Sequence, residues 1–195
     1  MAVSADLVKR LREITGSSIT LCKKVLEETA GDMDRAMSLL KKSSEALAAK
    51  KSERATAAGI IETYVHGTKK VGVMLELRCE TDFVARTEEF QKLAHDIALH
   101  IAGIKPLYVN KNEISEEARA EAERLFSEEA RSLGKSPDMT KKIVEGKMEA
   151  HFRDVSLLSQ PFVKDPSFTI EEMIKRSITH FGEKIEVARF ARYEL

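Results

Sequence analysis

Apolar side chains recur at spacings of three and four residues through the first part of the chain, a pattern typical of amphipathic helices. Three such runs precede residue 48, with apolar positions at Leu7, Val8, Leu11 and Ile14, then Ile19, Cys22, Val25 and Leu26, then Met33, Ala36, Met37 and Leu40. Ser4 is a candidate cap for the first helix, and Asp32 is a candidate cap for the third. We therefore expect a three-helix domain over residues 1–47.

The pattern changes between residues 41 and 58, where Lys, Ala and Ser predominate. We expect the third helix to run through the start of this segment and into an exposed linker over residues 48–58. Its lysines are interpreted as a solvated surface, because a short charged run is more typical of an exposed helix face than of a dedicated binding patch.

From residue 59 onward the pattern predicts a mixture of strands and helices. Residues 60–66 and 71–78 flank Gly67-Thr68-Lys69-Lys70, which is a hairpin signature. Further helices are expected over residues 81–102, 116–133, 137–154 and from 169 to about 178. Pro161 and Pro166 should bracket a loop, and Ile185, Val187 and Phe190 indicate a final strand. The predicted class is α+β, with residues 59–195 forming a small antiparallel sheet that is covered by helices and has an open edge.

The amino-acid composition argues against several classes of protein. The 195 residues include 43% hydrophobic and 33% charged side chains, which favours a folded chain over a disordered one. The 32 acidic and 32 basic residues balance, which argues against broad electrostatic binding to nucleic acid or a membrane. Cys22 and Cys79 lie far apart, so neither a zinc site nor a disulfide framework is indicated. No signal peptide or membrane span is recognisable, and we expect a cytoplasmic location.

Signatures of covalent catalysis are missing from the sequence. It contains no phosphate-binding glycine loop, no GxSxG and no HExxH pattern. His95 and His100 share one predicted helix, but at 100° per residue they point about 140° apart and cannot share a metal. We therefore expect a binding protein without a catalytic residue, a cofactor or a metal of its own.

The sharpest change of pattern lies at the junction between the second predicted strand and the following helix. The nonamer Arg78-Cys79-Glu80-Thr81-Asp82-Phe83-Val84-Ala85-Arg86 occupies this position. Thr81 or Asp82 is a plausible helix N-cap, and Phe83 would stand at the helix start. From the residues alone, a cap followed by a core aromatic explains the segment as well as a binding site does.

This nonamer resembles the signature segment of the elongation factor Ts family, whose members exchange nucleotide on the translational GTPase elongation factor Tu. Two further motifs match that family in the same order, at residues 7–24 and in the C-terminal part, where Gln160-Pro161-Phe162-Val163 and Phe190-Ala191-Arg192-Tyr193-Glu194 occur. The resemblance implies a factor that binds GDP-bound and nucleotide-free elongation factor Tu, displaces its Mg²⁺ and releases GDP. The residues that would push into the GTPase are Thr81, Asp82, Phe83 and Val84.

The N-terminal helices resemble a ubiquitin-associated-type bundle, which in this family contacts the nucleotide domain of the GTPase. The matching positions are Arg12, Ile19, Thr20 and Lys23. Thr20 departs from the family pattern, because many relatives carry bulky apolar side chains at both middle positions. The other interpretation is that Ile19 only seals the three-helix core.

Longer relatives contain two copies of the mixed α/β unit, whereas this chain has room for one. The resemblance therefore implies a homodimer that forms a two-plus-two complex with the GTPase, using the open sheet edge. Two other hypotheses stay open. One is a ubiquitin-associated-like adaptor without exchange activity, and the other is an RNA-associated protein that uses Lys41, Lys42, Lys50, Lys51 and Arg54.

Overall fold

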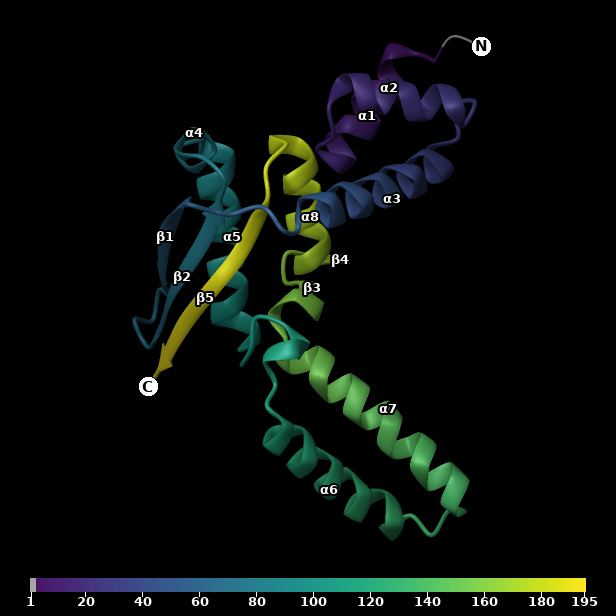
Figure 1. The fold of residues 1–195 in the computed structure, drawn as a ribbon, viewed down its shortest axis with the longest axis vertical. Helices are drawn as coiled ribbons and strands as arrows, with labels where there is room; N and C mark the ends of the chain where they lie inside the picture. The colour runs from purple at the N-terminus through teal and green to yellow at the C-terminus, as the bar shows by residue number, and fades with distance from the viewer. Residues whose placement is uncertain (1–2) are drawn as a thin grey trace. The chain divides into compact units, whose positions relative to one another are not determined.

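A computed structural model describes residues 3–195, and two compact units can be distinguished in it. The first unit takes in residues up to 62 together with 75–95 and 171–188, and the second takes in 63–74, 96–170 and 189–195. Figure 1 shows the helices and strands, and the observed α+β class confirms the predicted one. The helices of the first part of the chain are α1 (Ala5–Thr15), α2 (Ile19–Glu28) and α3 (Met33–Lys51).

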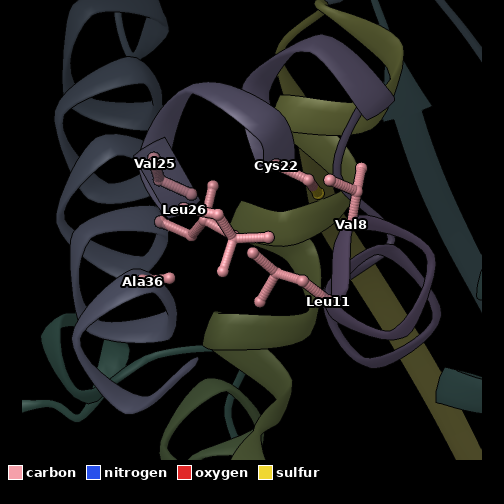
Figure 2. Packing of buried hydrophobic residues seen from close by; sticks show 7 residues of the cluster. Val8, Leu11, Cys22, Val25, Leu26 and Ala36 are labelled. Carbon is pink, nitrogen blue, oxygen red and sulfur yellow. The ribbon is translucent and has the colours of Figure 1, made fainter. Parts of the chain in front are cut away.

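The N-terminal helices enclose a small apolar core. Figure 2 shows side chains from α1, α2 and α3 pointing toward one another, with Leu26 near their centre. The core is formed by the apolar positions that the periodicity identified, namely Val8, Leu11, Cys22, Val25, Leu26, Ala36 and Leu40. The predicted three-helix bundle is therefore confirmed.

Local capping explains where these helices begin and end. The Oγ of Ser4 accepts a hydrogen bond from the Leu7 N–H at 3.3 Å, and Asp32 accepts one from the Arg35 N–H at 3.0 Å. Gly16 ends α1 in the left-handed conformation, with φ of 66°, where a side chain would be strained. Both caps predicted from the sequence are thus present.

The tail of α3 is more ordered than a solvated linker. The helix continues to Lys51, whose side chain is buried and donates to the carbonyl of Gly182. Ser44 is also buried, and its hydroxyl accepts a hydrogen bond from Thr179 at 2.9 Å. The expectation that this tail is solvated is therefore wrong for these two residues. The division of the chain at residues 47 and 58 stays a prediction.

A three-stranded sheet has the order β1–β2–β5, formed by β1 (Ala58–Val65), β2 (Val71–Cys79) and β5 (Ile185–Glu194). The β1–β2 hairpin closes where the His66 N–H donates to the Val71 carbonyl at 2.9 Å, around the predicted loop. Val73, Leu75 and Leu77 of β2 are buried and alternate with more exposed residues. Within residues 3–195, the outer edges of β1 and β5 have no neighbouring strand.

The helix expected over residues 81–102 is interrupted. The structure has a four-residue α4 (Asp82–Ala85) and then α5 (Glu88–Ile104). Thr87 separates them, because its Oγ1 accepts from the Phe90 N–H at 3.2 Å and donates to the Val84 carbonyl at 2.8 Å. A new helix N-terminus is thereby capped at Thr87, and the prediction of one continuous helix was wrong.

The second unit contains a long helical hairpin, α6 (Glu116–Ser132) and α7 (Pro137–Val155), which Figure 1 shows side by side. Ile114, Ala122 and Phe152 are buried at its base. The loop predicted between Pro161 and Pro166 is instead a short antiparallel pair, β3 (Pro161–Phe162) and β4 (Asp165–Thr169), in which Pro161 faces Thr169. The chain then enters α8 (Ile170–Phe181), and short 3₁₀ turns occur at Lys111–Glu113 and Leu157–Ser159. No helix among residues 3–195 has both the length and the apolar character to span a membrane.

Candidate functional site

The segment from Thr81 to Val84 follows β2 and comprises the N-cap and the first three residues of α4. Thr81, Asp82 and Phe83 are exposed, whereas Val84 is buried. The Phe83 ring is 88% exposed. Among residues 3–195, no other phenylalanine belongs to the large hydrophobic residues that are exposed. Such exposure removes a phenylalanine from the apolar environment that it favours, so this ring is available to a partner.

Phe83 is therefore not the core aromatic that the capping interpretation required. The aromatic core position of this region is Phe90 on α5, which is fully buried. Its ring lies 6.2 Å from that of Phe181 in an edge-to-face arrangement. The turn that carries Phe83 thus precedes a well-packed helix.

Thr81 anchors the turn through three hydrogen bonds. Its N–H and its Oγ1 donate to the two carboxylate oxygens of Glu183, at 3.0 and 2.6 Å. Its carbonyl accepts from the Cys79 thiol, with a sulfur–oxygen distance of 3.2 Å. Burial raises the pKa of the Cys79 thiol, so the sulfur stays protonated and able to donate. The backbone before Phe83 is consequently held on two sides.

Neither predicted cap acts as a side-chain cap. Thr81 occupies the N-cap position of α4 with an extended backbone, but its hydroxyl makes no cap hydrogen bond, because it is engaged with Glu183. Asp82 is the first residue of α4, and its carboxylate lies 3.6 Å from the Arg86 guanidinium. Asp82 therefore presents an exposed acid beside Phe83.

Three of the four N-terminal candidate residues share one hollow on the helical bundle. The hollow has a volume of about 360 Å³ and is lined by Val3, Ala5, Val8, Lys9, Arg12, Ile19 and Lys23. Ile19 is 57% exposed, so the interpretation that it only seals the core is wrong. Thr20 is exposed but does not line the hollow. The surface combines an apolar floor with basic side chains.

The basic residues of α3 and of the segment that follows it are partly engaged within the protein. Lys41 contacts Glu172 at 2.5 Å, Lys51 donates to Gly182, and Arg54 contacts Glu80 at 3.3 Å. Lys42 and Lys50 are exposed. Because three of the five cations have protein partners, the structure offers little free charge for the hypothesis of RNA binding.

The histidines do not form a metal site. His100 is fully buried, where its Nε2 donates to the Gln160 side-chain oxygen at 2.9 Å and its Nδ1 accepts from the Val163 N–H at 3.1 Å. Burial lowers the pKa of His100, in keeping with a neutral ring. Across residues 3–195 there is no group of three His, Cys, Asp or Glu side chains placed to hold a metal ion.

Glu183 was not predicted from the sequence. This residue follows Gly182, which ends α8 in the left-handed conformation, and it lies 102 positions from Thr81 in the chain. A contact at such a separation leaves no local pattern. The turn itself, by contrast, was identified from the change of periodicity.

Comparison with known proteins identifies the family. The family described as Elongation factor TS matches residues 6–195. Among curated proteins, Elongation factor Ts of Coprothermobacter proteolyticus is 46% identical over 195 residues, covering 100% of this chain and 99% of the relative. Elongation factor Ts of Rubrobacter xylanophilus is 45% identical over 195 residues and covers 100% of both chains. The protein belongs to the elongation factor Ts family of translation elongation factors.

Proposed function

We propose that the chain is the guanine-nucleotide exchange factor for elongation factor Tu. It binds the GDP-bound GTPase, promotes GDP release and holds the nucleotide-free form until a new nucleotide enters. The observation that carries the proposal is the exposed Phe83 ring on a turn whose backbone is fixed at Thr81. The chain performs no covalent chemistry in this role and needs no cofactor.

The Phe83 ring acts as a wedge. Transfer of an exposed aromatic ring into an apolar slot of the partner yields about 1.5–3 kcal/mol, enough to drive a local helix shift. Thr81 and Asp82 contact the same region of the GTPase, whereas Val84, which the sequence also assigned to this contact, is buried in the free chain. The shift moves the elements that orient the GTPase's Mg²⁺, so electrostatic support for the GDP phosphates is lost and GDP leaves faster.

Thermodynamic coupling makes the action catalytic. If the chain weakens GDP binding a hundredfold, GDP must weaken binding of the chain by the same factor, which corresponds to about 2.7 kcal/mol. Entry of a new nucleotide therefore expels the chain. The chain is then free to act on another GTPase.

The hollow on the N-terminal bundle supplies a second contact with the GTPase. Ile19 provides an exposed apolar side chain, and Arg12 and Lys23 add positive charge at the same surface. An apolar centre with a charged rim is typical of protein interfaces. Thr20 lies beside this surface and contributes at its margin. This contact holds the factor in place while Phe83 acts.

A homodimer completes the assembly and forms a two-plus-two complex with the GTPase. Within the second unit, the sheet exposes Val65, Met74 and Tyr193, and Met74 alternates with the buried Val73 and so lies on the opposite face. An exposed apolar sheet face next to open strand edges favours a symmetric contact with a second copy. The complex is expected in the cytoplasm, without direct contact to nucleic acid or membrane.

The exchange proposal is tested with Phe83→Ala in an assay that follows release of fluorescent GDP from elongation factor Tu. We expect the stimulated rate to fall at least about tenfold, equivalent to about 1.4 kcal/mol. Leu107→Ala is the matched control, because Leu107 is also an exposed apolar residue, at 68%. Equal rates for both variants would show that Phe83 is not the wedge.

A further inference from the structure

We propose that Glu80 and Glu183 form a reciprocal carboxylate clamp that positions Phe83 for exchange, with Glu183 as the dominant positioning residue. The inference rests on the proposed exchange function and extends it to two residues outside the set that contacts the GTPase. Each carboxylate accepts hydrogen bonds from the backbone of the segment that carries the other. The clamp thereby joins the β2–α4 turn to the α8–β5 turn.

Glu183 supplies one half of the clamp. Its carboxylate accepts three hydrogen bonds, from the Glu80 N–H at 3.1 Å, the Thr81 N–H at 3.0 Å and the Thr81 hydroxyl at 2.6 Å. Hydrogen bonds to an ionised carboxylate are stronger than neutral ones. Two successive backbone N–H groups, those of Glu80 and Thr81, are thus fixed three and two residues before Phe83.

Glu80 supplies the other half. Its carboxylate accepts from the Lys184 N–H at 2.6 Å and contacts the Arg54 guanidinium at 3.3 Å. The Lys184 hydrogen bond, followed by Arg54, lowers the pKa of Glu80, so this carboxylate stays ionised at neutral pH. Glu80 therefore holds Lys184, while Glu183 holds Glu80 and Thr81. These mutual hydrogen bonds couple the positions of the two turns.

The exposed ring explains why such a clamp is needed. A buried aromatic side chain is positioned by its neighbours, but Phe83 is 88% exposed and has little packing of its own. The α4 helix that carries it has four residues and no side-chain cap, so helix formation cannot fix it either. The backbone hydrogen bonds to Glu183 hold the wedge in place before binding, which avoids the cost of ordering the turn in the complex.

The test compares Glu183→Ala with Glu171→Ala, a matched control that removes an exposed α8 carboxylate paired with Lys175 at 2.7 Å. In the free chain, we expect faster amide hydrogen exchange at Glu80 and Thr81 in Glu183→Ala alone. In the fluorescent-GDP assay, its maximal release rate should fall about tenfold. The concentration of chain at half-maximal rate should change less than about twofold, because the N-terminal contact is untouched.

A double-mutant cycle with Phe83→Ala identifies how Glu183 acts. In the Phe83→Ala background, Glu183→Ala should cause no further loss of rate, since no wedge remains to be positioned. An equal loss in both backgrounds, or an unchanged rate in Glu183→Ala despite faster amide exchange, would overturn the inference. If Glu183→Ala unfolds, Glu183→Gln keeps the size and one acceptor oxygen, and it should give an intermediate rate.

Failure of the proposed function gives a different result. The unmodified chain would then leave GDP release unchanged, while amide exchange at Glu80 and Thr81 would still report whether Glu183 holds the turn. Unchanged amide exchange in Glu183→Ala would by itself contradict the clamp.

Discussion

Phe83 and Phe90 lie close together in the sequence and have opposite environments. Phe90 is fully buried, whereas Phe83 is almost fully exposed. We expect Phe83→Ala to change the free energy of unfolding by less than about 0.5 kcal/mol, because surface substitutions rarely do more. Phe90→Ala should cost about 3–5 kcal/mol. Chemical denaturation of both variants measures the difference. A large loss of unfolding free energy for Phe83→Ala would show that this ring is part of the core.

His100 makes the stability of the second unit depend on pH. Its folded-state pKa is lowered by burial, whereas the unfolded chain titrates near about 6.5. Below that pH the unfolded state binds a proton that the folded state does not, so stability falls as the pH decreases, by up to about 1.4 kcal/mol per pH unit. Above it, the contribution of His100 is constant.

Denaturation curves between neutral and acidic pH measure this effect in the full chain. His100→Gln removes the titrating group and is the control. We expect it to be less stable at neutral pH, because Gln cannot reproduce both ring hydrogen bonds, to Gln160 and Val163. Its pH slope in this range should be smaller. An equal slope in both proteins would show that other groups cause the pH dependence.

At the level of elements, the β1–β2 hairpin depends on a close approach of two backbones. Gly59 has φ of 152°, and a Cβ there would lie 2.3 Å from the Leu77 carbonyl oxygen. We expect Gly59→Ala to destabilise the protein by at least about 2 kcal/mol through overpacking and strain. Gly72→Ala is the matched control on β2, where a Cβ meets nothing within 4 Å, and it should change stability by less than about 1 kcal/mol. Equal melting temperatures for the two variants would contradict this account.

The elements also show which features a sequence can predict. Helix ends at Ser4 and Asp32 follow from local caps, and β2 follows from its alternation, so these were predicted correctly. The break at Thr87 was missed, because apolar spacing alone does not distinguish one long helix from two that share a face. The β3–β4 pair was missed because Pro161 and Pro166 mark a turn but do not reveal strand pairing.

The candidate site, too, could be predicted from the sequence only in part. The exposed turn was located by its change of periodicity, but the periodicity could not decide whether Phe83 points into the core or outward. Burial at Phe90 and exposure at Phe83 depend on packing between distant segments. Glu183 could not be found at all from the sequence, since its role arises only when the α8–β5 turn meets Thr81.

For the molecule as a whole, we expect a homodimer in solution. Light scattering at micromolar concentration should give twice the monomer mass for the unmodified chain. The double variant Val65→Lys/Met74→Lys should weaken association at least about a hundredfold, or about 2.7 kcal/mol, because it places charges on the apolar sheet face. Ile104→Lys, at an exposed apolar position on α5, is the control. A monomeric unmodified chain, alone and with the GTPase, would refute the dimer but not the exchange function.

Catalysis of nucleotide exchange by the chain can be measured directly. The most direct measurement loads elongation factor Tu with fluorescent GDP, adds excess unlabelled GDP and a substoichiometric amount of the unmodified chain, and follows the fluorescence. We predict that all the labelled GDP is released, at an initial rate proportional to the concentration of the chain, because each molecule acts repeatedly. Release at the rate seen without the chain, or release that stops after one GDP per chain, would contradict it.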